Sequence, residues 1–249
     1  MAERPRVLGI IPARGGSKSV PRKNLRPLLG RPLIAWSILS AKRAKSLDRV
    51  IVSTDDGEIA EVARRYLAEV PFLRPAEIAA DDTPDLPVFQ HALEVLRDSE
   101  GYVPDAIVHL RPTQPLRTAE EIDRAVELWA SSGADCVKSV VPVSEHPFKM
   151  YRARGDRLLP YWDSEERRRR GPDVPRQSLP PLYLSAGVVD VVRREVVEAG
   201  STEGDRVVPY FVDPARYVNL DSARDFQIAE ALMRALGEPY PPLLSTLRN

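Results

Sequence analysis

Strands and helices are predicted to alternate along the first two thirds of this chain, and that alternation constrains its fold more than any other feature. Short, almost wholly apolar runs are predicted to be strands, namely 7–11, 50–53, 70–73 and 106–110. Segments with apolar residues at helical spacing are predicted to be helices at 32–44, 57–67, from Asp85 onward, and after a capping box at 118–121. Strands that are apolar on both faces and alternate with helices predict an α/β fold with a doubly wound, mostly parallel sheet. In such a sheet the ligand site lies outside the carboxyl ends of the strands.

The regular order breaks after Val143. Residues 144–181 are rich in proline and charge and weakly periodic, so we expect an insertion that projects from the sheet toward a second subunit. Within it, Glu165 and Arg169 are spaced for an ion pair on a solvated helix face. Further strands are predicted at 182–192, 207–212 and 216–220, and a final helix at 221–236. We interpret residues 1–249 as a single domain that carries this inserted excursion.

The composition excludes several kinds of partner. Lys plus Arg and Asp plus Glu both number 36, and aromatic residues make up only 6% of the chain, so nucleic acid is not expected as a partner. No apolar run is long enough to span a bilayer and none resembles a signal peptide, so we expect a cytoplasmic protein with no membrane partner. The single cysteine, Cys136, is interpreted as a small buried hydrophobe, and His109 as a packed core residue.

Cations gather in the loop that follows the first predicted strand. Residues 14–31 contain six Lys and Arg and no acid, with Gly15 and Gly16 near their start. Adjacent glycines let backbone N–H groups converge on one anion, and Arg14 and Lys18 can add charge-assisted contacts to phosphate oxygens. The loop is neither a Walker A motif nor a dinucleotide-binding motif. Its position at the carboxyl end of a strand favours a polyphosphate site over a basic surface loop.

Residues 11–24 are similar to the signature loop of acylneuraminate and related sugar-acid cytidylyltransferases. Other segments resemble that family in the same order, at 52–55, 73–77, 110–117, 175–180 and 220–222. The resemblance implies a Rossmann-like nucleotidyltransferase fold with a dimerisation insertion, and therefore a homodimer. It also implies an enzyme that transfers CMP from CTP to the anomeric hydroxyl of a sialic acid-like 2-keto sugar acid and releases pyrophosphate.

The resemblance further implies roles for individual residues. CTP is expected to bind at Ala13, Arg14, Gly15, Gly16, Lys18, Lys23, Asn24 and Arg74. The sugar acid is expected to bind at Arg111, Arg117, Lys149, Arg176 and Gln177. Arg14, Lys18 and Asp221 are expected to be the catalytic residues, because transfer at phosphorus needs positioning and neutralisation more than covalent chemistry.

A magnesium site is expected near the end of the chain. The family commonly has an Asp-x-Asp pair that holds Mg²⁺, and this chain has Asn219 and Asp221 at those positions. In an extended strand these two side chains would share a face, with Asp221 supplying the charge and Asn219 a neutral oxygen. The alternative is that Asp221 is only the N-cap of the final helix.

The sequence leaves the identity of the sugar open. The family usually has Gln at the position of Arg111, and sialic-acid enzymes typically have Arg-Pro-Asn-Gly where this chain has residues 184–187. One alternative is a nucleotidyltransferase for another sugar, such as legionaminic, pseudaminic or 3-deoxy-octulosonic acid or a sugar phosphate. A second alternative is a non-catalytic nucleotide-binding paralogue. No general base and no covalent nucleophile is predicted.

Overall fold

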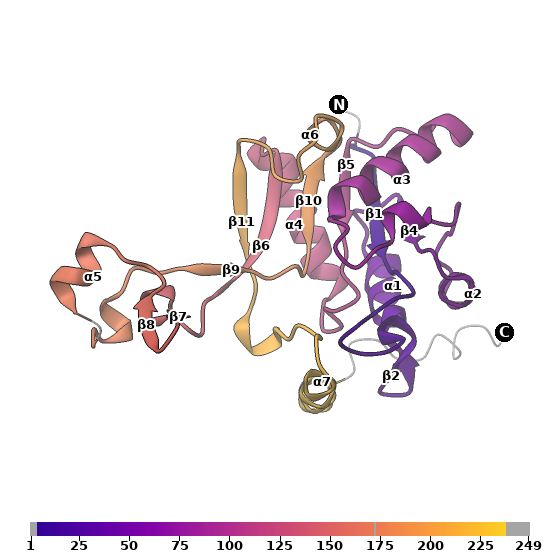
Figure 1. The fold of residues 1–249 in the computed structure, drawn as a ribbon. Coiled ribbons are helices and arrows are strands. Elements are labelled where there is room, and N and C mark those ends of the chain that lie inside the picture. The colour runs from indigo at the N-terminus through magenta and orange to yellow at the C-terminus, as the bar shows by residue number, and fades with distance from the viewer. Residues whose placement is uncertain (1–3, 172, 238–249) are drawn as a thin grey trace.

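A seven-stranded sheet forms the centre of the part of the chain that this computed structural model describes, residues 4–171 and 173–237. The strands are β1 (Val7–Pro12), β4 (Arg49–Ser53), β5 (Ala106–His109), β6 (Cys136–Pro142), β9 (Tyr183–Ser185), β10 (Asp190–Arg193) and β11 (Val207–Phe211). Their order is β11-β6-β10-β5-β1-β4, with β9 also paired to β6 (Figure 1). Only β9 and β10 run antiparallel to their neighbours in this sheet. The predicted mostly parallel sheet is confirmed.

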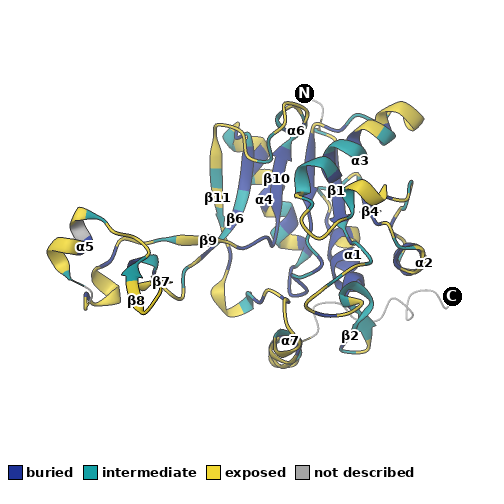
Figure 2. Ribbon diagram, viewed as in Figure 1, coloured by how far each residue is buried: buried dark blue, intermediate teal, exposed yellow. Residues whose placement is uncertain are grey.

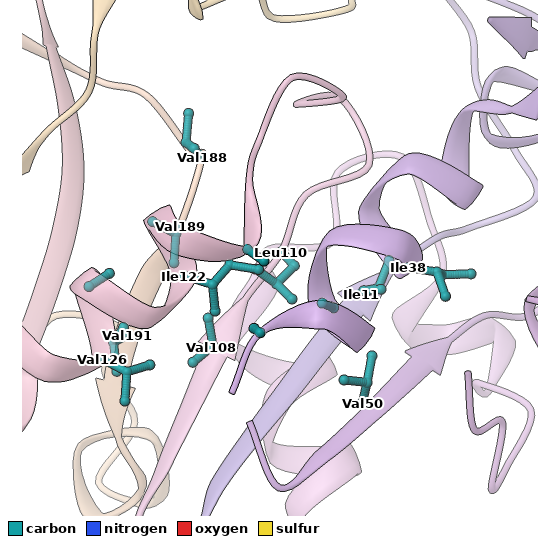
Figure 3. Close-up of a cluster of buried hydrophobic side chains, with 14 of the residues drawn as sticks. Ile11, Ile38, Val50, Val108, Leu110, Ile122, Val126, Val188, Val189 and Val191 are labelled. Carbon is teal, nitrogen blue, oxygen red and sulfur yellow. The ribbon is translucent and has the colours of Figure 1, made fainter. Parts of the chain in front are cut away.

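Helices cover both faces of the sheet. The longer ones are α1 (Leu33–Arg43), α2 (Gly57–Arg65), α3 (Asp85–Glu100), α4 (Ala119–Ser132) and α7 (Ala223–Leu236). Alternate residues of β1 point to opposite faces, so Ile11 packs with α1, α2 and α4, whereas Ile10 packs with α3. Figure 3 shows the first of these clusters, in which Ile11, Ile38 and Ile122 come together from β1, α1 and α4. The doubly wound arrangement is therefore also confirmed.

The capping box predicted at 118–121 is present. The Thr118 hydroxyl accepts the Glu121 N–H at 3.2 Å, and the Glu121 carboxylate accepts the Thr118 N–H at 2.8 Å. This reciprocal pair satisfies two N–H groups that the first turn of α4 leaves without a helical partner. It fixes where the loop from β5 ends, and that loop carries part of the site.

Two predicted strands are absent from the described residues, and a third is divided. The run 70–73 forms no strand, because Pro71 removes a donor and the only pairing there is a bridge between Ile51 and Glu69. The run 216–220 begins in a 3-10 turn at Pro214–Arg216 and continues without strand pairing. The run 182–192 is split into β9 and β10, because the Ser139 hydroxyl accepts the N–H groups of Val188 and Val189 and draws the backbone out of register.

Residues 144–181 extend away from the main body, as Figure 1 shows. They form a hairpin of β7 (Tyr151–Arg154) and β8 (Arg157–Pro160), the short helix α5 (Glu165–Arg170) and two 3-10 turns. A small cluster of Phe148, Val174 and Leu179 holds this arm together, and Figure 2 shows that most of its other residues are exposed. The helix α5 is not wholly solvated, because the guanidinium of Arg167 lies over the rings of Phe148 and Tyr151.

Cys136 is fully buried in β6, where burial raises the pKa of its thiol to about 12, so it is a small core residue as predicted. None of the helices among residues 4–171 and 173–237 has the length and apolar character that crossing a membrane would require.

Candidate active site

A cavity of about 500 Å³ opens at the carboxyl ends of β1 and β5, the edge of the sheet at which the sequence places the site. Its lining is Pro12, Arg14, Gly16, Ser17, Lys18, Ser19, Lys23, Asn24, Arg74, Ala80, Asp81, Thr83, Asp85, Val88, His109, Arg111, Pro112, Thr113 and Asp221. Five of these residues are Lys or Arg and three are Asp, so the cavity carries a net positive charge that suits a polyphosphate.

The two cations predicted to meet the triphosphate share one acidic partner. The carboxylate of Asp81 lies 2.5 Å from Arg14 and 2.7 Å from Lys18. These two cations hold the pKa of Asp81 below its ordinary value, with the Lys18 hydrogen bond as the largest cause. The Lys18 side chain is 85% exposed, so its pair is open to water and easily exchanged for another anion.

A second pair of predicted residues ties the basic loop to the end of the chain. Lys23 donates to the Leu220 carbonyl at 3.0 Å and lies 3.2 Å from an Asp221 carboxylate oxygen. Asn24 donates to the Arg14 carbonyl at 2.9 Å and so braces the loop from inside. Both side chains line the cavity, and Lys23 is directed by these contacts toward the same region as Asp221.

The small residues of the loop differ in what they do. Gly16 lines the cavity, whereas Ala13 is buried and its N–H donates to the Ser53 carbonyl. The sequence suggested that the Gly15 N–H would bind a phosphate. In the structure this N–H instead donates to Asp55 at 2.9 Å. A Cβ at position 15 would lie 2.6 Å from Asp56, so glycine is required there by a close approach.

Arg74 and Arg111 reach the cavity from different elements. Arg74 is largely buried, donates to the Ser53 hydroxyl at 3.1 Å and to its carbonyl at 2.5 Å, and burial lowers its pKa. Arg111 follows β5 and pairs with Asp85, the first residue of α3, at 3.0 Å. A Cβ at Gly187 would lie 3.0 Å from the Arg111 side chain, so this glycine, which has a φ of +62°, leaves room for the guanidinium.

His109 lies at the base of the cavity with 4% of its surface exposed. Its Nδ1 is 3.8 Å from Asp85, and its Nε2 is buried without a hydrogen-bond partner. Burial lowers the pKa of this imidazole to about 4, so the ring is neutral at physiological pH. Its ring also packs edge-on against Phe89, which agrees with the interpretation of a packed histidine, although it also faces the cavity.

Four of the predicted sugar-acid residues do not line the cavity. Arg117 is 2% exposed and donates to the Val188 and Arg111 carbonyls and the Ser37 hydroxyl, so its guanidinium holds the fold beneath the site. Arg117 was expected to bind the sugar acid, but its side chain is buried and does not line the cavity. Lys149, Arg176 and Gln177 are not among the residues that line the cavity. They lie in 3-10 turns at 147–149 and 176–178 of the arm, which projects from the main body (Figure 1).

The residues predicted to hold magnesium have a clear hydrogen-bond geometry. Asn219 donates its Nδ2 to Asp221 at 2.5 Å, and its Oδ1 accepts from Gln114 at 3.1 Å. The oxygen that Asn219 was expected to offer a cation therefore accepts a hydrogen bond from Gln114. Asp221 is not the N-cap of α7 either, because Ser222 holds that position with Asp225 in a reciprocal capping box.

The donor set fits Mg²⁺ through a single carboxylate. The described residues contain no group of three or more His, Cys, Asp and Glu that could hold a metal ion. Mg²⁺ is commonly held by one or two carboxylates together with substrate phosphates and water, and Asp221 provides one exposed carboxylate at the cavity wall.

Among the cavity-wall residues that sequence reasoning missed are the polar residues Asp81, Thr83 and Asp85. Asp81 and Thr83 lie in the loop between the 3-10 turn at 76–78 and α3, and Asp85 is the first residue of α3. A signal was present, because acids at positions 81, 82 and 85 closely follow the family-like segment 73–77, where a helix is predicted to begin. The sequence does not show that this acidic loop lies opposite the basic loop, because that arrangement depends on the tertiary fold.

A basic pocket at the carboxyl edge of a doubly wound sheet defines a nucleotide-binding α/β protein. A model of the family described as cytidylyltransferase matches residues 8–156. The chain is 31% identical to the post-translational flagellin modification protein B of Campylobacter coli, covering 92% of this chain and 95% of that protein. It is 30% identical to the CMP-N,N'-diacetyllegionaminic acid synthase of Legionella pneumophila, covering 92% of this chain and 96% of that protein.

The fold is also similar to that of a solved CMP:2-keto-3-deoxy-manno-octonic acid synthetase complexed with CTP. The TM-score is 0.65 at 17% identity, and the match covers 93% of this chain and 100% of the other. The chain belongs to the cytidylyltransferase family, and it is accordingly a CTP-dependent nucleotidyltransferase.

Proposed function

We propose that this enzyme transfers CMP from CTP to the anomeric hydroxyl of a sialic acid-like 2-keto sugar acid and releases pyrophosphate. The observation that carries the proposal is the cavity itself, in which the basic loop after β1 faces Arg111 across the carboxyl edge of the sheet. The loop cations suit a triphosphate, and Arg111 offers a fork of donors that matches a carboxylate. The similarity to an enzyme named for a CMP-linked legionaminic acid supports an acceptor of this class.

In this mechanism the CTP phosphates replace Asp81 on Arg14 and Lys18. Lys23 and Asn24 hold the loop in place, and Arg74 lines the nucleotide side of the cavity. The acceptor carboxylate lies against Arg111, so that the anomeric hydroxyl is directed at the α-phosphorus for in-line attack. Asp221 would hold Mg²⁺, which neutralises charge on the phosphates when bound. Consumption of CTP further supports a cytoplasmic reaction.

We further propose that the enzyme is a homodimer built on the arm, residues 144–181. Leu158 and Tyr161 on the arm are each 69% exposed, and Trp162 is 45% exposed. Exposed apolar residues gathered on a projecting segment are typical of an interface. In such a dimer Lys149, Arg176 and Gln177 would meet the sugar acid in the site of the partner subunit, which accounts for their distance from their own cavity.

Pyrophosphate release measured with each of the four nucleoside triphosphates and a panel of eight- and nine-carbon 2-keto sugar acids tests the function. We expect release only with CTP, only with magnesium, and only when an acceptor is present. Arg14→Ala should weaken CTP binding by roughly tenfold or more, the value of a charge-assisted hydrogen bond. Lys42→Ala, which removes an exposed cation of α1 outside the cavity, should leave binding unchanged.

The same panel separates the alternatives. Release with a sugar phosphate in place of every sugar acid would assign a different acceptor class. Binding of CTP with no pyrophosphate from any acceptor would identify a non-catalytic nucleotide-binding protein and would contradict the proposal.

A further inference from the structure

Gln114 is a buried amide at the turn that follows β5, and it does not itself line the cavity. Its side chain is 3% exposed, and its Nε2 donates to the Ala186 carbonyl at 3.0 Å and to Asn219 Oδ1 at 3.1 Å. Asn219 Nδ2 in turn donates to Asp221 at 2.5 Å. A continuous series of hydrogen bonds therefore runs from the backbone before β10, through two amides, to the carboxylate at the cavity wall.

The donor and acceptor at each step of this series are determined by its first hydrogen bond, from Gln114 to the Ala186 carbonyl. The orientation of an amide side chain must be decided from its hydrogen bonds, because its oxygen and nitrogen look alike. The Ala186 carbonyl can only accept, so Gln114 must present Nε2 to it. The second N–H of that group then donates to Asn219 Oδ1, which leaves Asn219 Nδ2 as the group that faces Asp221.

Asp221 is consequently held from both sides by donors. Asn219 donates to its Oδ2, and Lys23 lies 3.2 Å from its Oδ1. A carboxylate at position 219 could also accept from Gln114, but it would face Asp221 as a like charge at close range. The amide of Asn219 holds Asp221 in place with no cation between them.

Gln114 also connects the two ends of the cavity. The segment it holds at Ala186 is followed by Gly187, which leaves room for Arg111. The backbone adds a parallel tie, because the Leu220 N–H donates to the Thr113 carbonyl at 3.1 Å. The acceptor side of the site and Asp221 are thus fixed to the same turn.

We propose that Gln114 is a positioning residue that acts through Asn219 to direct the carboxylate of Asp221 into the cavity, and that Asn219 serves as this connection and not as a metal ligand. The inference rests on the proposed function, because it takes Asp221 as the carboxylate that meets the metal and the phosphates of CTP. Groups that orient a metal-binding side chain are typically worth about ten- to a hundredfold in metal affinity.

Calorimetric titration of CTP with and without Mg²⁺, in the absence of any sugar acid, tests this role. Gln114→Met keeps the volume of the side chain and removes both donors. We expect the factor by which magnesium increases CTP affinity to be at least about tenfold smaller in this variant than in wild type. Asn219→Ala should give the same loss. Because both residues act through one series, the double variant should lose no more than either single variant. Thermal unfolding of each variant checks that the fold is kept.

The outcomes separate this inference from the function on which it rests. A wild-type protein that binds no CTP would remove the proposed function. If magnesium increases the CTP affinity of the wild type and of Gln114→Met by the same factor, the role of Gln114 is overturned while the proposed function stands. Additive losses in the double variant would overturn the connection through Asn219, and so would a wild-type CTP affinity that does not depend on magnesium. Should Gln114→Met fail to fold, the Asn219→Ala titration decides in the same way.

Discussion

At the scale of single residues, the end of the chain separates two roles that the sequence could not separate. Ser222 caps α7 through Asp225, and its neighbour Asp221 is left at the cavity wall beside Lys23. Adjacent residues can therefore be changed to test stability and catalysis independently. His109 is a second single residue with a testable property, because its titratable ring is buried next to the cavity.

Asp221→Asn should lower kcat at least about a hundredfold, because it removes the one charged group that we assign to the metal. The melting temperature should hardly move, since Asp221 is exposed and does not cap the helix. The matched control is Ser222→Ala, which should cost about 1 kcal/mol of stability and leave turnover near wild type. Steady-state kinetics and thermal unfolding of both variants check this. Turnover that survives Asp221→Asn would contradict the metal assignment.

The burial of His109 predicts how stability changes with pH. Its pKa falls from an ordinary 6.5 to about 4 in the folded protein, so between these values the unfolded chain binds a proton that the folded chain does not. The folded state therefore loses up to roughly 1.4 kcal/mol per pH unit as pH falls through that window, and its stability from this source is complete above pH 6.5.

Urea unfolding from pH 7.5 to 4.5 measures the effect as the difference between wild type and His109→Gln. The charged groups around the ring are Asp85, Arg111, Asp190 and Arg117, and both proteins keep them. We expect the wild type to lose stability more steeply below pH 6.5. An equal pH dependence of the unfolding free energy in the two proteins would show that the pKa of His109 is not lowered in the folded state.

Side-chain direction is what the sequence could not provide for the site. Arg14, Lys18, Lys23 and Asn24 follow a strand end directly, and topology alone places them at the cavity. Arg117 follows the end of β5 in the same way, yet its side chain turns inward and donates to the carbonyls of Val188 and Arg111.

At the scale of elements, two loops of opposite charge face each other across the cavity. The loop after β1 carries Arg14 and Lys18, and the loop before α3 carries Asp81, which pairs with both. A carboxylate on these cations occupies the place where phosphates would be neutralised. The proposed binding of the CTP phosphates to Arg14 and Lys18 would therefore separate this contact.

Asp81→Asn should tighten CTP binding roughly two- to fivefold, because the phosphates would no longer compete with an exposed ion pair. The matched control is Asp82→Asn, which changes the adjacent acid that does not line the cavity and should leave affinity unchanged. Isothermal calorimetry at constant ionic strength measures both. Weaker binding in Asp81→Asn would indicate that the acid instead holds the cations in place for the nucleotide.

Elements with strong local signals were predicted well from the sequence, and those without were not. The helices from Asp85 and Thr118 follow the apolar spacing and the capping box. The division of 182–192 could not be foreseen, because it depends on hydrogen bonds from Val188 and Val189 to Ser139, which is about fifty residues away. Apolar character alone does not distinguish a strand from a buried loop.

At the scale of the whole molecule, the arm is the feature that a single chain leaves unexplained. It projects from the main body (Figure 1), and its described residues include one small apolar cluster. It carries Lys149, Arg176 and Gln177, which do not line the cavity. Two roles of the arm are predicted from sequence resemblance, namely dimer formation and binding of the sugar acid. Both can be tested in one experiment.

Co-expression of Asp221→Asn with Arg176→Ala, under two different tags, yields a heterodimer with one site that has both wild-type residues if the arm serves the partner subunit. Each parent homodimer should be nearly inactive, and the purified heterodimer should recover about half of wild-type activity. Light scattering should show a dimer for all three. A heterodimer no more active than its parents, or a fully active monomer, would rule out the arm as part of the partner's site.

A phosphorus NMR time course of the complete reaction follows the proposed transfer of CMP from CTP to a 2-keto sugar acid as it occurs. We predict that the three CTP signals disappear together and are replaced by one phosphodiester signal of a CMP-sugar and by pyrophosphate, in equal amounts. Formation of CDP with inorganic phosphate, or of free CMP with pyrophosphate at a rate that does not depend on the sugar acid, would contradict the account.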